Sequence, residues 1–194
     1  MIRALPASFY ARDVLEVAPA LLGARLVRNL DGMEIAGIIT EVEAYRGEED
    51  LACHARAGRT PRTTVMYGPP GRAYVYFTYG MHWMLNAVCM PPDQPAAALI
   101  RAIRPLSGLD AIAARRAGVD TAHWTDGPAK LCRALGIDRA LNGCDLTDSS
   151  GELWIESGMA VPAEQIWTTP RIGLGNTPEP WKSLPWRFTY SENS

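Results

Sequence analysis

Several features that define other protein classes are missing from this sequence. Its four cysteines form no C-x-x-C pair, which argues against a structural zinc site; they are Cys53, Cys89, Cys132 and Cys144. No segment approaches about 18 consecutive apolar residues, and the N-terminal residues lack the apolar stretch of a signal peptide. We therefore expect a cytoplasmic protein with reduced, packed cysteines, no metal ion and no membrane partner.

Lysine is also scarce. Only Lys130 and Lys182 are lysines among the 19 cationic residues, and the other 17 are arginines. A guanidinium group makes planar, bidentate contacts with phosphates and carboxylates, which an ammonium group does not. Genomic base composition produces the same bias, so both explanations stay open. The net charge of −2 and the pI of about 5.9 exclude a basic field over the whole molecule.

The hydrophobic content is sufficient for a folded core. At 194 residues with 47% hydrophobic residues, the sequence favours one compact domain over residues 1–194. The predicted strands are 24–29, 33–45, 72–78, 82–90, 96–104, 152–156 and 186–190, and the predicted helices are 14–22, 109–117 and 129–135. We expect Pro105 to end the fifth strand. The pattern predicts an α+β domain with a mainly antiparallel β-sheet flanked by helices.

The second predicted strand carries the first candidate site. Strand alternation places Ile35, Ile39, Glu41, Glu43 and Tyr45 on one face. Two carboxylates two residues apart lie roughly 7 Å from each other, a separation at which they can act as acid and base on a glycosidic bond. The alternative is a pair of solvated residues at a strand end, which is the commoner case for an arbitrary glutamate pair. The aromatic and cationic residues nearby in the sequence favour a site.

A long polar segment with little periodicity follows over residues 47–70. It carries Arg56, Arg59 and Arg62, and no acidic residue follows Asp50 for the rest of the segment. Like charges without partners repel one another unless an anion is present. The segment therefore favours phosphate contact over the alternative, a solvated loop.

The aromatic residues of the third strand have two explanations. Tyr74 and Tyr76 share one face, a pattern that ordinary packing in a sheet explains more often than a site. Tyr79 differs because it precedes Gly80 at the tip of a predicted hairpin, where a large ring has little core to enter. A protruding ring of this kind suits insertion between stacked bases.

The three histidines carry weaker signals. His82 and His123 have no evident partner in the sequence, and we interpret them as structural. His54 opens the arginine-rich segment, although a lone histidine is more often a surface residue. Its neighbour Cys53 offers poor geometry for a shared metal ion, so a metal site is excluded at this position.

The motifs follow one another in an order that matches a known family. Along the chain they are EVEAY (41–45), HAR (54–56), TPRT (60–63), YVYFTYGM (74–81), Asn86, LIRAIRP (99–105), GPAKLCRAL (127–135), RIGLG (171–175) and PWRF (185–188). This order resembles the alkyladenine (3-methyladenine) DNA glycosylase family from about Asp13 to Tyr190. The resemblance implies a curved sheet with a protruding β-hairpin. The departures from the family pattern are Arg46, His82 and Trp83, and they leave the range of substrates open.

The resemblance implies a catalytic role for three residues. Glu43 matches the general base that positions a water for attack on C1′ of the sugar, and Arg101 matches the arginine beside that water. The backbone carbonyl of Ile172 matches a further ligand of the water. A Schiff-base lyase would need an amine nucleophile. Neither Lys130 nor Lys182 falls in the candidate pocket, so we expect a monofunctional enzyme.

The resemblance also implies how a damaged base and its duplex are held. The residues matched to base contacts are Tyr45, His54, Tyr76 and Asn86, the last of which helps to exclude guanine. Tyr79 matches the tyrosine that fills the gap left in the duplex, and Met81 lies beside it. The residues expected on phosphates are Arg56, Arg59 and Arg62.

These matches imply a base-excision repair DNA glycosylase that flips alkylated or deaminated purines out of duplex DNA and leaves an abasic site. No cofactor is implied, the expected partner is double-stranded DNA containing damaged purines, and we expect a monomer, nucleoid-associated in a prokaryote. One alternative is a non-catalytic binder of damaged or distorted DNA on the same fold, and a weaker one is a carbohydrate glycosidase that uses Glu41 and Glu43. The sequence does not rank 3-methyladenine, 7-methylguanine, hypoxanthine and ethenoadenine as substrates.

Overall fold

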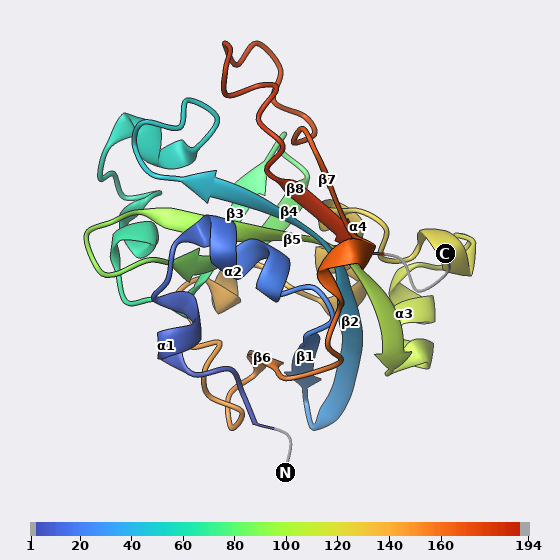
Figure 1. The fold of residues 1–194 in the computed structure, drawn as a ribbon. Coiled ribbons are helices and arrows are strands. Elements are labelled where there is room, and N and C mark those ends of the chain that lie inside the picture. Colours follow the sequence, from blue (N-terminus) through green and yellow to red (C-terminus); the bar gives the residue numbers. More distant parts are fainter. Residues whose placement is uncertain (1–2, 191–194) are drawn as a thin grey trace.

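A computed structural model describes residues 3–190 (Figure 1). The strands are β1 (Arg25–Leu30), β2 (Met33–Arg46), β3 (Ala73–Thr78), β4 (His82–Cys89), β5 (Ala96–Ser107), β6 (Leu153–Glu156), β7 (Ile166–Thr169) and β8 (Arg187–Tyr190). The α-helices are α1 (Ala7–Tyr10), α2 (Val14–Ala20), α3 (Leu109–Arg115) and α4 (Pro128–Leu135). Short 3-10 helices are η1 (His54–Ala57), η2 (Thr64–Tyr67), η3 (Thr121–His123), η4 (Arg139–Leu141) and η5 (Ala163–Gln165).

The strands form one curved, antiparallel sheet, as the sequence predicted. The main path runs β3-β4-β5-β2-β1-β6. One edge of β2 pairs with β5 along most of its length, whereas the other edge pairs first with β1 and then with β8. In Figure 1, β2 curves through the centre of the molecule, and the loop between β7 and β8 projects at the top. The α+β class is therefore confirmed.

The helices pack their apolar residues onto the sheet to form the main core. Asp13 begins α2 by accepting a hydrogen bond from the N–H of Leu15 at 2.9 Å, and Val14, Val17 and Ala18 are buried. The predicted helix 14–22 ends early, at Ala20, close after a proline inside the helix. The start of α4 at a proline and its end at a left-handed glycine match the prediction.

Two irregular positions in the centre of the sheet correct the predicted face of β2. The β2–β5 register shifts on both sides of Glu41 and leaves Thr40 and Arg101 without Cα partners. Before this bulge Ile38 and Ile39 both pack in the main core, whereas after it Val42 does so and Glu41 and Glu43 both contact Arg101. The prediction that Glu41 and Ile39 share a face is therefore wrong, because one unpaired residue on each strand interrupts the alternation.

Two further predictions differ from the structure. Pro105 does not end the fifth strand, since β5 continues to Ser107 with Pro105 opposite Gly37. Beyond Leu99, β5 pairs with β2 alone, and a proline is tolerated on a strand with a free edge. The segment 47–70 is not irregular throughout, because η1 and η2 lie within it. Within residues 3–190, no helix has the length and apolar character needed to cross a membrane.

Candidate active site

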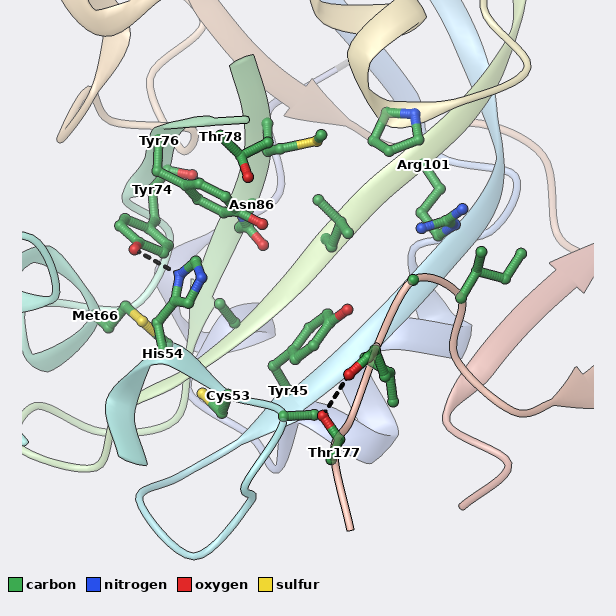
Figure 2. Close-up of a pocket in the computed structure, with 18 of the residues that line it drawn as sticks. Tyr45, Cys53, His54, Met66, Tyr74, Tyr76, Thr78, Asn86, Arg101 and Thr177 are labelled. Carbon is green, nitrogen blue, oxygen red and sulfur yellow. Dashed lines mark hydrogen bonds between the residues drawn. The ribbon is translucent and has the colours of Figure 1, made fainter. Parts of the chain in front are cut away.

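One cavity of about 420 Å³ lies between the β3–β4 hairpin, the η1 segment and the β7–β8 loop (Figure 2). Its volume falls in the range of roughly 300–1,000 Å³ that is usual for small-ligand sites. The residues predicted from the sequence that line it are Tyr45, His54, Arg56, Tyr76, Tyr79, Asn86, Arg101 and Ile172. The fold therefore brings together side chains from five separate parts of the chain, namely β2, η1, the β3–β4 hairpin, β5 and the β7–β8 loop. Glu43, Met81, Arg59 and Arg62 do not line the cavity itself.

Glu43 lies behind the cavity wall and is completely buried. Its Oε2 accepts a hydrogen bond from the hydroxyl of Tyr45 at 2.8 Å and lies 3.2 Å from Nη1 of Arg101. Its Oε1 accepts a hydrogen bond from the backbone N–H of Ile172 at 2.7 Å. Ile172 thus meets Glu43 through its N–H, a contact that was not predicted, since the prediction concerned its carbonyl. A carboxylate has about four acceptor positions, so these three contacts leave one for a water.

Glu41 is held by two arginines and is not free to act as an acid or base. Its Oε1 accepts hydrogen bonds from Nε of Arg101 at 2.7 Å and from Nε of Arg187 at 2.6 Å. Arg187 reaches this position from β8 and also donates to Thr169. Arg101 therefore spans both carboxylates, and Glu41 fixes its orientation. No role was predicted for Arg187, which follows the tryptophan of the PWRF motif.

Aromatic rings and a neutral imidazole form one wall of the cavity. Burial, followed by the charges of Arg62 and Arg56, lowers the pKa of His54 to about 4. Nε2 of His54 lies 3.4 Å from Arg62, which can only donate, so Nδ1 carries the proton. That N–H donates to the hydroxyl oxygen of Tyr74 at 3.0 Å, as Figure 2 shows. The His54 and Tyr76 rings meet edge to face at 4.5 Å.

Tyr45 and Asn86 complete the polar groups of the wall. Burial, followed by the nearby charge of Glu43, raises the pKa of Tyr45 well above its usual value, so its hydroxyl stays a hydrogen-bond donor. Nδ2 of Asn86 donates to the backbone carbonyl of Tyr74 at 3.0 Å, which fixes the orientation of a buried amide. The amide and the phenol are therefore held before any ligand enters.

The β3–β4 hairpin presents exposed apolar residues beside the cavity. Tyr79 is 79% exposed and Met81 is 67% exposed. Tyr79 also has a φ of +51°, and Gly80 follows with +68°. A large ring held in a left-handed conformation at a hairpin tip has no packing reason to be there, which indicates a role in binding.

The arginines of the segment 47–70 are exposed but do not lack partners. Arg59 forms an ion pair with Asp93 and lies over the ring of Tyr67. Arg62 lies over the ring of Tyr76 at 5.1 Å, and Arg56 donates to a backbone carbonyl at 2.6 Å. The expectation of unpaired like charges is therefore wrong, because the β4–β5 connection brings an acid from outside the segment.

For other single residues, some predictions match the structure and others do not. His123 has a partner, since its Nδ1 lies 2.7 Å from Asp126. Cys53, Cys89 and Cys132 are free and buried, as predicted. Asp50 and Arg171, for which no role was predicted, form a completely buried ion pair beside Glu43. Arg171 could have been suspected because it directly precedes Ile172. In the part of the chain that the structure describes, no three potential ligands gather as in a metal site.

Comparison with a family model and comparison with individual proteins give the same result. Residues 8–194 match the family model described as methylpurine-DNA glycosylase. A protein of Carboxydothermus hydrogenoformans named "Putative 3-methyladenine DNA glycosylase" is 48% identical over 189 residues, which cover 97% of this chain and 96% of that protein. Proteins with the same name from Methanocella arvoryzae and Anaeromyxobacter dehalogenans are each 48% identical, over 98% and 95% of this chain and over 93% and 82% of their own lengths.

Proposed function

Because the chain belongs to the methylpurine-DNA glycosylase family, we propose that it excises alkylated or deaminated purines from duplex DNA. The reaction hydrolyses the N-glycosidic bond and leaves an abasic site in an unbroken strand. The observation that carries the proposal is the buried Glu43 carboxylate, fixed by three donors directly behind a cavity with aromatic walls. Neither lysine lines that cavity, which supports hydrolysis by water instead of an amine-dependent lyase reaction.

The target base must leave the duplex before it can react. Flipping costs a few kcal/mol, and an exposed ring inserted into the duplex offsets part of that cost. Tyr79 is placed to be this ring, with Met81 beside it. The flipped base would enter the cavity and stack against Tyr45, His54 and Tyr76. An electron-poor alkylated purine gains most from aromatic walls, since its positive charge is attracted to their faces.

Glu43 then activates the water. Its unused acceptor position would bind a water once the Ile172 segment shifts slightly, because the carboxylate is sealed from solvent in the structure. As a carboxylate, it accepts the proton of that water and stabilises the positive charge that develops on the sugar. Arg101, 3.2 Å from Oε2, would keep Glu43 aimed at the sugar. His54 is neutral near pH 7 and supplies no proton to the leaving base.

The direct test is release of free base from duplexes that contain 3-methyladenine, 7-methylguanine, hypoxanthine or ethenoadenine. The wild-type protein is expected to release at least one of them without breaking the strand. Glu43→Gln should lower the rate by about 10²–10⁴-fold and leave DNA affinity nearly unchanged. Wild-type turnover by that variant would remove Glu43 from the mechanism.

A matched control is Glu156→Gln. Glu156 is also buried and paired with an arginine, Arg25, but it lies on β6, and the residues that line the cavity come from other parts of the chain. This variant should retain base release. Binding without base release by the wild type would instead favour the non-catalytic binder. The carbohydrate glycosidase finds little support, because Glu41 is occupied by two arginines.

The proposed substrate also suggests where and how the protein works. It would act wherever genomic DNA is found, and one chain supplies every residue of the proposed site. A monomer is therefore sufficient for the reaction.

A further inference from the structure

An ion pair without solvent contact lies beside the proposed catalytic group. Nη1 and Nη2 of Arg171 lie 2.6 and 2.9 Å from Oδ2 and Oδ1 of Asp50, a bidentate contact between two completely buried side chains. Removing two charges from water costs several kcal/mol each, and an apolar pair of the same size often serves stability as well. Stability alone therefore gives little reason for this pair.

The guanidinium group of Arg171 contacts the strand that carries Glu43. Its Nη1 donates to the backbone carbonyl of Ala44 at 2.9 Å, between Glu43 and Tyr45 in the chain. Its plane lies over the ring of Tyr45, with 4.7 Å between Cζ and the ring centroid. Its Cζ also lies 5.0 Å from the ring centroid of Trp186, and its Nη2 donates to the carbonyl of Trp181 at 3.1 Å.

Both neutral donors to Glu43 are thus attached to this one arginine. The N–H on Oε1 belongs to Ile172, the next residue in the chain, and the hydroxyl on Oε2 belongs to Tyr45, whose ring lies against the guanidinium. A displacement of Arg171 would move both donors. Arg101, the third contact of Glu43, is held independently by Glu41.

Asp50 connects the arginine to a third segment. Its carboxylate accepts hydrogen bonds from the N–H of Arg46 at 3.1 Å and of Ala52 at 3.0 Å, and its carbonyl accepts one from Cys53 at 2.8 Å. His54 follows directly. The pair therefore joins the end of β2, the start of η1 and the β7–β8 loop, which are three of the parts that surround the cavity.

We infer that Asp50 and Arg171 are a positioning pair for the reaction, which fixes the Ile172 N–H and the Tyr45 hydroxyl on Glu43. The pair touches neither the sugar nor the base in this role. It acts by holding the general base in the orientation that the attacking water requires, where a misplacement of about 1 Å can cost about 10²-fold in rate. The inference rests on the proposed function, because Glu43 must be the base for its orientation to matter.

The kinetic test uses Asp50→Asn and Arg171→Lys, two variants of nearly unchanged size. We expect the single-turnover rate of base release at saturating enzyme to fall about 10–100-fold in each. Affinity for a duplex with a tetrahydrofuran abasic analogue should change less than about threefold. The double variant should be about as slow as the slower single variant, since the two residues act as a unit. Additive losses, loss of affinity alone, or wild-type rates in a folded variant would each overturn the inference.

Arg28→Lys is the matched control. Arg28 is also buried and paired with an acid, Glu152, at the β1 side of the sheet. Glu152 is 70% exposed, so this variant should lose some stability, measured by thermal unfolding, and keep the wild-type rate. An equal loss of rate in Arg28→Lys would show that general destabilisation explains the effect.

A second measurement needs no substrate. Hydrogen exchange followed by NMR should show slow exchange of the Ile172 amide in the DNA-free wild type and faster exchange in Asp50→Asn and Arg171→Lys. Protection that persists in both variants contradicts the positioning role. If the wild type releases no base at all, the proposed function fails, and the exchange data still decide whether the pair fixes Ile172.

Discussion

Single residues of the proposed site depend on charges that water does not reach. Glu43, Asp50 and Arg171 are all buried, and each is stable there because fixed donors or an opposite charge compensate it. The sequence predicted Glu43 from its motif. It could not predict that Arg171 lies against Asp50, because the two are 121 residues apart and only the folded sheet brings them together.

Protonation of His54 should affect stability at mildly acidic pH. Its pKa falls from the ordinary 6.5 to about 4 in the folded state, chiefly through burial. Between these values the unfolded chain binds more protons than the folded one, so the free energy of unfolding decreases as the pH falls from about 6.5 to 4. The total effect is on the order of 2–3 kcal/mol after allowance for partial exposure of the ring.

The comparison of wild type with His54→Gln measures this contribution. Urea unfolding at several pH values between 4 and 8 should show a smaller acid-induced loss of stability in the variant. Between pH 8 and 4, the free energy of unfolding of the wild type should fall by about 2–3 kcal/mol more than that of the variant. Parallel curves for the two proteins would mean that His54 titrates normally in the folded state.

At the scale of elements, the bulge at the centre of β2 and β5 decides what the cavity contains. Local patterns predicted most strands, since alternation and turn residues are visible in the sequence. They did not predict the unpaired positions Thr40 and Arg101, because a bulge depends on the partner strand. Without it, Glu43 would lie on the face of Ile39, in the main core. Strand β2, which carries Glu43, was predicted correctly, but the opposite facing of Ile39 and Glu43 was not.

Replacing Tyr79, the ring proposed to enter the duplex, should stabilise the β3–β4 hairpin. Met81 N–H donates to the carbonyl of Thr78, and both central residues of this turn, Tyr79 and Gly80, have positive φ. Asparagine is preferred before glycine in such turns, whereas a bulky residue is strained. Tyr79→Asn should therefore stabilise the protein by about 1 kcal/mol, or roughly 2–4 °C in Tm.

The same substitution should slow base release by about tenfold or more, because no ring would fill the gap in the duplex. Calorimetry and a single-turnover assay on the same preparation give both numbers. Tyr79→Phe keeps the ring and should resemble the wild type in both. A Tyr79→Asn variant that is more stable and fully active would contradict the proposed insertion.

For the whole molecule, a net charge of −2 does not describe the surface that DNA would meet. Three exposed arginines, Arg56, Arg59 and Arg62, lie in the segment that borders the cavity, and Arg56 lines it. Asp93 partly neutralises them, which the sequence could not indicate because it follows in a later connection. The overall charge would repel DNA weakly, so binding depends on this local patch. We therefore expect few phosphate contacts and an affinity that is sensitive to salt.

The salt dependence of DNA binding tests this patch. Each phosphate contact lowers the slope of log K against log salt by about 0.9. If the three arginines each contact one phosphate, the wild-type slope should be about −3, and Arg56→Ala should reduce its magnitude by about one. Arg3→Ala serves as the control, because Arg3 is exposed and its carbonyl accepts a hydrogen bond from the N–H of Ser157, and neither residue lines the cavity. A wild-type slope near zero would contradict the role given to the patch.

The unpaired residue Thr40 makes the length of β2 as important as its composition. Losing one residue between Ile39 and Glu41 would exchange the two faces of the rest of the strand. Val42 would then face the cavity and Glu43 the helices, although every side chain of the site would still be present in the sequence. Losing two residues would restore the original facing. Divergence among homologous chains is therefore expected to proceed here by substitution, whereas single-residue insertions and deletions should be eliminated by selection.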